Sequence, residues 1–515
     1  MGFDPQGLIG KVGFVPTTLD MPTASLQEAP GTSELRQLRR ARRADRVAQL
    51  VALTVLLAGP AILCLHMAFV ADCDIWWHMR TGEWILLHRA IPHNEPFSVL
   101  AGTPWAAYSW AFEVIVYKLF HWFGLPGILA YSTGMVLLIT IALYRMVSRV
   151  QADFTVAALL TFIPMFSMGH LLTPRPWMFT ILLFVLELDI LMSSRRTGRK
   201  AGLLWLPVLF AIWANTHIQF VDGLFVLGLA FAESLLSRWW KGAQRGVGPV
   251  WLGLALAGSI AGTLLNPYGW RLYSVAHDLA TQSGALNKVT ELQAIPFRSL
   301  PDFAVLLLAL AAVAALGWRS RLVSFEGALL AFAIVLSFRS QRDVWVTAVV
   351  AAVILASSIV SSEKRSAKIA ASAIAIASLL AFMVVSAGFR MWRISDQVLQ
   401  AGIDKAFPVG AVRQVAAMGI TGPVYSNFNW GGYLIWNLRT PVVIDGRQNV
   451  YGDQRIDRSV ATWSGEPDWS TDKELAGAAV VIGPVKSPLV QLLRTDQHFR
   501  KVYEDQVAAV FVPQR

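Results

Sequence analysis

The chain has 515 residues, of which 55% are hydrophobic and 15% are charged, and its mean hydropathy is +0.50. A soluble globular protein of this length does not need so much apolar surface, so the composition excludes a soluble enzyme and indicates that lipid surrounds most of the chain. The formal net charge of +11 does not indicate a nucleic-acid partner, because the basic residues form short clusters between apolar runs, as the positive-inside rule predicts. The two cysteines, Cys64 and Cys73, have neither zinc-binding nor CxxC spacing.

Residues 1–46 are predicted to be a cytoplasmic tail. The tract is polar and ends in a cluster of arginines, and no apolar core precedes that cluster as it would in a signal peptide. The cluster comprises Arg36, Arg39, Arg40, Arg42, Arg43 and Arg46.

About eleven transmembrane helices are predicted within residues 47–389, where long apolar runs alternate with short polar connections. They cover residues 47–70, 124–144, 153–170, 177–193, 202–214, 223–237, 250–265, 302–317, 324–337, 344–361 and 368–389. The basic connections all fall on the side of the N-terminal tail, which places that side in the cytoplasm. An odd number of spans then places residues 390–515 outside, in the periplasm of a Gram-negative cell. We therefore expect a multi-pass inner-membrane protein.

The external loop at residues 71–123 is rich in acidic, basic and aromatic side chains, and its apolar character suits two helices in the membrane interface. It contains Asp72, Asp74, His78, Arg80, Glu83 and Glu113. A carboxylate pair at the end of a span is costly near hydrocarbon unless it has a partner or a function. Asp72 and Asp74 are therefore either helix caps in water or a base and an orienting acid at the rim of a cavity.

Further polar residues gather on the same predicted face of the membrane. They are His170, Thr173, Arg175, Asn215, His217, Gln219, Asp222, Asn266, Tyr268, Arg271, Arg339, Gln341, Arg342 and Asp343. Arg175, Arg339 and Arg342 run against the charge rule for external segments. Bidentate binding of a phosphate would account for them, and so would ion pairs with nearby carboxylates.

Residues 390–515 are predicted to form a small external α/β domain. PVYSN, PVVID, AAVVIGP, FRKVYED and VAAVFVP have the composition of strands, while WGGYLIWNL and residues 471–477 and 487–494 are expected to be helical. The segment IDGRQNVYGD places polar residues directly after a strand, where α/β folds hold ligands. The domain is expected either to cover the membrane cavity or bind an acceptor glycan, or to serve only as a folding cap.

Several motifs together resemble a large group of bacterial membrane proteins related to the protein O-mannosyltransferase and lipid A aminoarabinose transferase class, called GT-C glycosyltransferases. They are DCDIWWHMRTGEWIL, IPHNEPFS, FEVIVYKLF, TPRPWMFT, WANTHIQFVDGL, NPYGW, SFRSQRD, NWGGYLIWNLRTPVVIDGRQNVYGD and VYEDQVAAVFV. The resemblance covers most of residues 71–515. It implies an all-α polytopic membrane domain of GT-C type followed by the α/β domain.

The resemblance also implies transfer of a sugar from a polyprenyl-phosphate donor to an external lipid, glycan or protein. Asp72 and Asp74 match the class's acidic pair and are the expected catalytic residues. The expected substrate-binding residues are His78, Arg80, Glu113, Arg175, His217, Arg339 and Arg342. The Asp-x-Asp spacing is compatible with a divalent cation, because hard cations favour oxygen ligands, but no metal or cofactor is predicted.

Two other functions remain open at this point. A transporter or flippase of lipid-linked glycans would be expected to show internal repeats or charges at the membrane midplane, and here the charges gather at one face. A non-catalytic component of an envelope polysaccharide system is the other alternative that the sequence leaves open.

Overall fold

The computed structural model describes residues 72–236, 246–282, 288–319, 324–359 and 395–514, with a few isolated positions before residue 72. Residues 1–47 and 48–515 form two separate units, and the description below concerns the second. The predicted first span at 47–70 and last span at 368–389 lie outside the described residues, isolated positions aside, and so does nearly all of the tail 1–46.

Every predicted span within the described residues corresponds to a helix. These helices are α4 (Leu125–Ser148), α5 (Phe154–Ser167), α6 (Trp177–Thr197), α7 (Leu206–Thr216), α8 (Phe220–Leu236), α9 (Pro249–Thr263), α12 (Leu300–Gly317), α13 (Ser324–Arg339) and α14 (Val344–Ser358). Four described stretches are long and apolar enough to cross a membrane, namely Leu125–Ser148, Trp177–Thr197, Leu300–Gly317 and Gln341–Ser358. The protein is thus a multi-pass membrane protein, while the number of eleven spans stays a prediction.

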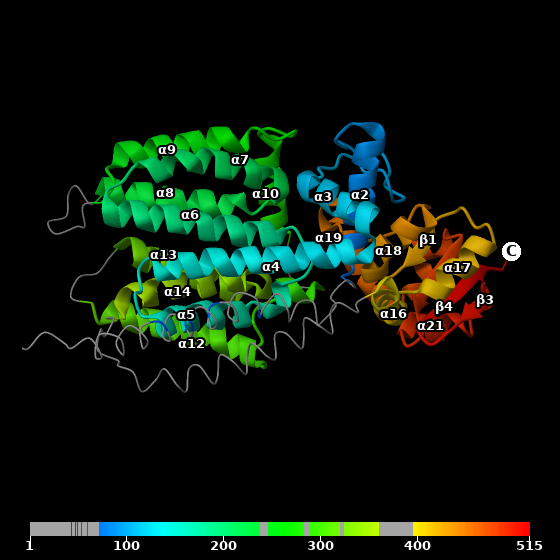
Figure 1. The fold of residues 1–515 in the computed structure, drawn as a ribbon. Coiled ribbons are helices and arrows are strands. Elements are labelled where there is room, and N and C mark those ends of the chain that lie inside the picture. Colours follow the sequence, from blue (N-terminus) through cyan, green and yellow to red (C-terminus); the bar gives the residue numbers. More distant parts are fainter. Residues whose placement is uncertain are drawn as a thin grey trace, which may run out of the picture. The chain divides into compact units, whose positions relative to one another are not determined.

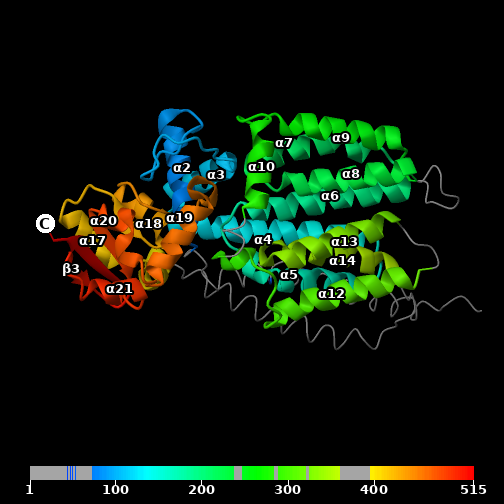
Figure 2. The ribbon, with the colours of Figure 1, turned by 180° about the vertical axis from the view of Figure 1, so that it is seen from behind.

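The membrane helices run side by side, with α6 between α4 and α8 and with α14 against α5 and α12 (Figure 1). Small residues permit the closest contacts. A Cβ atom on Gly262 of α9 would overlap with the Pro207 carbonyl oxygen of α7, so these two helices meet backbone to backbone. The view from behind shows α7 and α9 together in the same arrangement (Figure 2). This close packing fixes the helix ends that form the cavity described below.

Two helices form within the first loop, as predicted. They are α2 (Ile75–His88) and α3 (Trp110–Phe123), and a Cβ atom on Gly82 of α2 would overlap with the Glu113 carbonyl oxygen of α3. A further helix, α10 (Arg271–Thr281), follows α9. Leu272 is its one buried residue, so the helix is largely exposed.

The C-terminal region contains a four-stranded sheet of order β1-β2-β4-β3. Strand β1 (Val424–Ser426) is parallel to β2 (Val480–Pro484), whereas β4 (Ala508–Pro513) is antiparallel to both β2 and β3 (Phe499–Glu504). These four strands were predicted. The prediction of a strand at PVVID is wrong, since Val442 alone forms isolated bridges to Ser98 and Val424. The chain bends at Val443, directly after this residue, and no ladder continues.

The helices of this region flank the sheet. The predicted helices are present as α18 (Phe428–Leu438), α20 (Lys473–Ala476) and α21 (Pro488–Leu493). The helices α16 (Asp396–Ala406), α17 (Val409–Ala417) and α19 (Gln448–Trp463) were not predicted. Two of them, α16 and α19, are mostly polar, and their apolar stripes are narrow.

The C-terminal region packs directly on the first loop, with α18 against α2. Trp76 of α2 meets the rings of Phe407 and Tyr433 with centroids 5.5 and 5.0 Å away. Glu83 of α2 accepts hydrogen bonds of 2.9 and 3.0 Å from Arg439, which follows α18. The C-terminal region is thereby held over the start of α2, where Asp72 and Asp74 lie.

Candidate functional site

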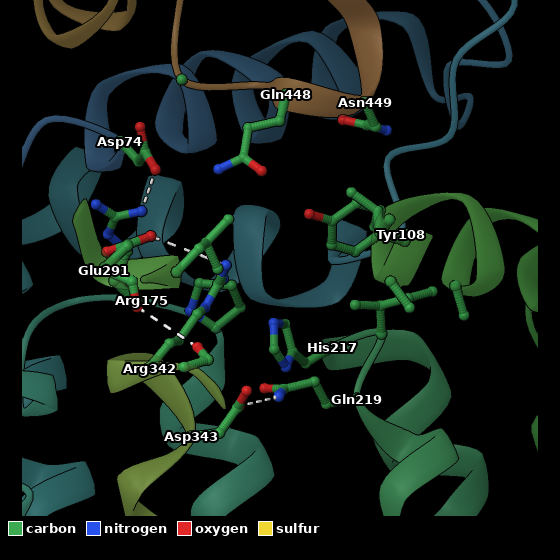
Figure 3. Close-up of a pocket in the computed structure, with 18 of the residues that line it drawn as sticks. Asp74, Tyr108, Arg175, His217, Gln219, Glu291, Arg342, Asp343, Gln448 and Asn449 are labelled. Carbon is green, nitrogen blue, oxygen red and sulfur yellow. Dashed lines mark hydrogen bonds and ion pairs between the residues drawn. The ribbon is translucent and has the colours of Figure 1, made fainter. Parts of the chain in front are cut away.

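A cavity lies where the first loop, the ends of the membrane helices and the C-terminal region meet (Figure 3). It contains about 1240 Å³ of empty space, which includes the solvent at its mouth. Its polar lining consists of Asp74, His78, Tyr108, Arg175, His217, Gln219, Asp222, Glu291, Arg339, Ser340, Arg342, Asp343, Arg447, Gln448 and Asn449. A pocket that binds a small ligand usually contains only a few polar groups, which orient the ligand.

Arg175 joins the two acidic residues at the start of α2. Its Nε lies 2.7 Å from Asp72 Oδ1, its Nη1 pairs with Asp74 Oδ2, and its Nη2 lies 3.5 Å from the Cys73 sulfur. Asp74 occupies the N-cap position of α2, but its side chain makes no capping hydrogen bond. Asp72 instead accepts a 2.8 Å hydrogen bond from the Asp74 backbone. The Asp74 carboxylate is therefore held by an arginine and directed at the cavity.

Burial raises the pKa of the Asp74 carboxyl from 3.8 to about 6, because the charged form loses its hydration. The Arg175 charge lowers this pKa and the Asp72 charge raises it further. A carboxyl with a pKa near 6 is mostly ionised at neutral pH and still basic enough to accept a proton, which is the property of a general base.

The Arg175 guanidinium lies between the two carboxylates, at the place that a divalent cation would need. In the described part of the chain, no three His, Cys, Asp or Glu side chains are grouped so that they could hold a metal ion.

Arg339 and Arg342 lie on another wall of the cavity, with Asp343 next to them. The Arg342 Nη1 is 3.8 Å from Glu291, and its Nε is buried without a hydrogen-bond partner among the described residues. The Arg342 guanidinium also lies 4.7 Å from the centre of the Trp177 ring, and Arg175 lies 5.0 Å from the same ring. Within the described residues, Arg339 donates a single hydrogen bond, of 3.0 Å to the Ala280 carbonyl.

Glu291 keeps a negative charge on this wall. Burial alone would raise the pKa of Glu291, but the charges of Arg175 and Arg342 outweigh it and lower the pKa. Glu291 is the ion-pair partner of Arg342 among the described residues, but the two groups are 3.8 Å apart. The charge of Arg342 is therefore only partly balanced, and its guanidinium can bind a further anion.

Two buried histidines line the cavity. His78 Nδ1 is 3.2 Å from Glu113 Oε1, and both side chains are buried. Burial raises the pKa of Glu113 and lowers that of His78, so neutral forms are favoured. His217 Nδ1 is 2.8 Å from Thr180 Oγ1, which accepts a 2.8 Å hydrogen bond from Trp213 Nε1. Both imidazoles are therefore fixed in orientation by residues outside the cavity.

The turn at Asp445–Asn449 closes the cavity from the C-terminal side. A Cβ atom on Gly446 would lie 2.8 Å from the Asp74 Cγ atom, so only glycine permits this approach. Arg447 is buried and pairs with Glu95 at 2.8 Å and with Asp445 at 2.6 Å. Tyr451 donates a 2.5 Å hydrogen bond to Asp445. The C-terminal region thus forms part of the cavity wall.

Most of the residues singled out in the sequence come together in this cavity. Asp74, His78, Arg175, His217, Arg339 and Arg342 line it. Asp72 and Glu113 lie behind lining residues, as partners of Arg175 and His78. Arg80 is not part of the lining, because it pairs with Glu83 on α2.

Glu291, Tyr108 and the residues Gly446–Asn449 also line the cavity. They were not predicted individually as site residues. Glu291 lies in a single 3-10 turn, Thr290–Leu292, and no motif marks it. The polar segment after PVVID was predicted as a place for a ligand, but the contact of Gly446 with Asp74 was not predicted.

Neither a protein-family model nor a curated protein sequence matches the chain. Solved structures do. The oligosaccharyltransferase AglB of Archaeoglobus fulgidus, in complex with an inhibitory peptide and a dolichol-phosphate, is similar over 87% of this chain and 70% of that one, with 11% identity and a TM-score of 0.55. The oligosaccharyltransferase of the same organism tethered to an acceptor peptide is similar over 92% and 74%, with 12% identity and a TM-score of 0.50.

ArnT of Cupriavidus metallidurans bound to undecaprenyl phosphate matches over 89% of this chain and 97% of that one, with 12% identity and a TM-score of 0.45. At these identities the likeness concerns the fold. The structural similarity confirms the resemblance noted in the sequence: the chain has the fold of the GT-C membrane glycosyltransferases.

Proposed function

We propose that this protein transfers a sugar from a polyprenyl-phosphate donor to a hydroxyl group of an acceptor outside the cytoplasm. The observation that carries the proposal is one cavity that holds a half-buried carboxylate with a pKa near 6, Asp74, and two arginines with few anionic partners, Arg339 and Arg342. A base and a phosphate-binding cation are the two groups that glycosyl transfer from a lipid phosphate needs.

In the proposed reaction, Asp74 acts on the acceptor, and the two arginines act on the leaving phosphate. The acceptor oxygen forms a bond to the anomeric carbon, while the bond from that carbon to the phosphate oxygen breaks. Asp74 takes the proton of the acceptor hydroxyl. The negative charge that develops on the leaving phosphate is stabilised by Arg342 and Arg339, whose planar forks suit phosphate oxygens.

Arg175 and Asp72 have a positioning role in this proposal. The sequence left Arg175 open as a phosphate contact. In the structure its Nε and Nη1 pair with Asp72 and Asp74, and its Nη2 lies near the Cys73 sulfur. It therefore orients Asp74 and keeps its pKa below the value that burial alone would give.

The fold supports the nature of the donor. The AglB structure contains a dolichol-phosphate and an inhibitory peptide, and the related structure contains a tethered acceptor peptide, so proteins of this fold bind a polyprenyl-type phosphate and, in a separate structure, an acceptor. By analogy, the donor of this protein is a polyprenyl phosphate sugar in the lipid bilayer. The acceptor and the C-terminal domain lie in the periplasm, and the N-terminal tail lies in the cytoplasm.

The test is transfer of radiolabelled sugar from polyprenyl-phosphate donors by the purified protein. Asp74→Asn keeps the size of the side chain but cannot accept a proton, and the loss of a positioned base costs about 10²–10⁴-fold in rate. Asp153→Asn is the matched control, because Asp153 caps α5 away from the cavity and asparagine caps equally well. Full activity of both Asp72→Asn and Asp74→Asn would refute this assignment of the base and leave Glu83 or Glu113 to be tried.

A further inference from the structure

The wall of the cavity that belongs to the C-terminal region differs in charge from the wall formed by the membrane helices. Arg447 is balanced by two carboxylates, those of Glu95 and Asp445, at 2.8 and 2.6 Å. Arg342 on the opposite wall has one carboxylate at 3.8 Å, and Arg339 has no ion pair within the described ranges. An anionic group is therefore favoured near Arg339 and Arg342 and disfavoured near Arg447.

Arg447 is held rigidly and still has a donor to offer. Its guanidinium lies between the rings of Phe97 and Trp105, 5.2 and 5.1 Å from their centres. The residue is 2% exposed, and its Nη1 has no hydrogen-bond partner among the described residues, although Arg447 lines the cavity. A buried N–H group without a partner is costly. The Nη1 atom is closed to solvent in this structure, so an acceptor atom of a ligand gains this hydrogen bond only after a small movement of the side chain.

The next two residues add amide groups to the same wall. Gln448 and Asn449 line the cavity, and their side chains form no hydrogen bond within the part of the chain that the structure describes. Figure 3 shows them along one side of the cavity near Tyr108, with Arg342, His217 and Asp343 on the other side. An amide carries both donors and an acceptor, as a hydroxyl does, so this pair suits neighbouring hydroxyl groups.

Two aromatic residues of the first loop add to the lining of the cavity. Trp77 and Tyr108 both line the cavity. An aromatic face packs against the C–H groups of a sugar ring, while amides and an N–H donor bind its hydroxyls. A phosphate would gain little from such a surface.

We propose that Arg447, Gln448 and Asn449, with Tyr108, bind the neutral glycosyl group that is transferred, so that the C-terminal domain selects the sugar while the membrane helices bind the lipid phosphate. This inference rests on the proposed function and adds the division of donor recognition between the two walls. It also assigns the sugar, an uncharged pyranose rich in hydroxyls, to residues far from the phosphate-binding arginines in the sequence.

The test compares the binding of undecaprenyl phosphate with that of undecaprenyl phosphate carrying glucose, mannose or galactose. The double variant Gln448→Ala, Asn449→Ala is used rather than an Arg447 variant, because removing a buried paired charge would unfold the region. Gln491→Ala is the control, since Gln491 is exposed on α21 and does not line the cavity. Thermal unfolding verifies that both variants remain folded.

The wild type is expected to bind at least one glycosylated lipid more tightly than undecaprenyl phosphate. The double variant should lose that preference, with affinity for the glycosylated lipid falling about 10-fold and affinity for undecaprenyl phosphate unchanged. A preference that persists in the double variant overturns the inference, and so does a wild type without any preference among the four lipids. A double variant altered only in its KM for the acceptor overturns it as well.

The two proposals fail in different ways. A wild type that binds glycosylated lipids selectively but transfers no sugar contradicts the proposed function and leaves the sugar-binding wall standing. A wild type that transfers sugar while the double variant keeps its full donor preference contradicts only the division of recognition between the walls.

Discussion

Gly446 in the C-terminal region lies directly against the carboxylate of Asp74 in the first loop. A Cβ atom at position 446 would be 2.8 Å from Asp74 Cγ and 3.3 Å from Oδ2, closer than a real side chain permits at Cγ. The proposed base is therefore positioned from two sides, by Arg175 through an ion pair and by the Gly446 backbone through contact. Glycine is needed here because of this approach, since Gly446 does not have a positive φ angle.

Substitution of Gly446 by alanine is predicted to reduce transfer strongly while the protein stays folded. The added methyl group displaces the Asp74 carboxylate, and a misplacement of about 1 Å at a reacting group costs on the order of 10²-fold in rate. Gly402→Ala is the control, because Gly402 lies within α16 and has no atom within 4 Å of a built Cβ. Initial rates and thermal unfolding of both variants test this, and an unchanged rate in Gly446→Ala would show that Asp74 does not need this support.

The pH dependence of transfer should follow the ionisation of Asp74. A base must be ionised to accept a proton, and burial raises the pKa of Asp74 from 3.8 to about 6. We therefore expect kcat/KM to rise about tenfold per pH unit below that value and to level off above it. An inflection near 4, or a rate that falls as the pH increases through 6, would argue against Asp74 as the base. The residual activity of Asp74→Asn should lack the inflection.

Lysine substitutions should separate the phosphate-binding arginines from the positioning one. Arg342→Lys and Arg339→Lys keep the charge but lose the planar fork, so affinity for undecaprenyl phosphate should fall roughly 10-fold. Arg175→Lys cannot contact Asp72 and Asp74 in the same way, so kcat should fall while donor affinity changes little. Arg271→Lys, on the exposed part of α10, is the control. Equal donor affinity in all the lysine variants would remove Arg339 and Arg342 from the phosphate site.

The predicted topology can be tested by single-cysteine labelling in a background without Cys64 and Cys73. Exposed positions are Thr197 at the end of α6, Asn94 in the first loop and Gln454 in α19. An impermeant maleimide added to intact spheroplasts should label cysteines at 94 and 454 but not at 197. Glu95 would be a poor probe because its side chain is buried against Arg447. Labelling at 197 from outside would reverse the orientation.

The apolar segments were predictable because a membrane helix needs a long run of hydrophobic residues, whatever it packs against. The strands at Val480–Pro484 and Ala508–Pro513 were predictable for a related reason, since both begin with a buried run of apolar residues. PVVID has a similar composition, but only Val442 pairs, through isolated bridges to Val424 and Ser98, and composition does not report how long such a pairing continues. The helix at Gln448–Trp463 has few apolar residues and was not predicted.

The candidate site was predictable as a set of residues on one membrane face, but its pairs were not. Asp74 and Arg175 are separated by 101 positions, and their contact depends on how the first loop folds over the start of α6. Arg175 was open to two interpretations, and the ion pair is the one present. No motif marks Glu291, and only the fold brings its carboxylate to within 3.8 Å of Arg342.

The ion pair between Glu95 and Arg447 also bears on how this protein can be recombined with others. Both side chains are buried and lie 2.8 Å apart, one in the first loop and one in the C-terminal region. Separating such partners leaves an unpaired buried charge, at a cost of about 3–5 kcal/mol, which is much of the stability of a small domain. A chimaera that exchanges only residues 395–514 would break this pair, together with the contact between Glu83 and Arg439. The smallest exchangeable module is therefore discontinuous in sequence and comprises residues 72–123 together with the C-terminal region.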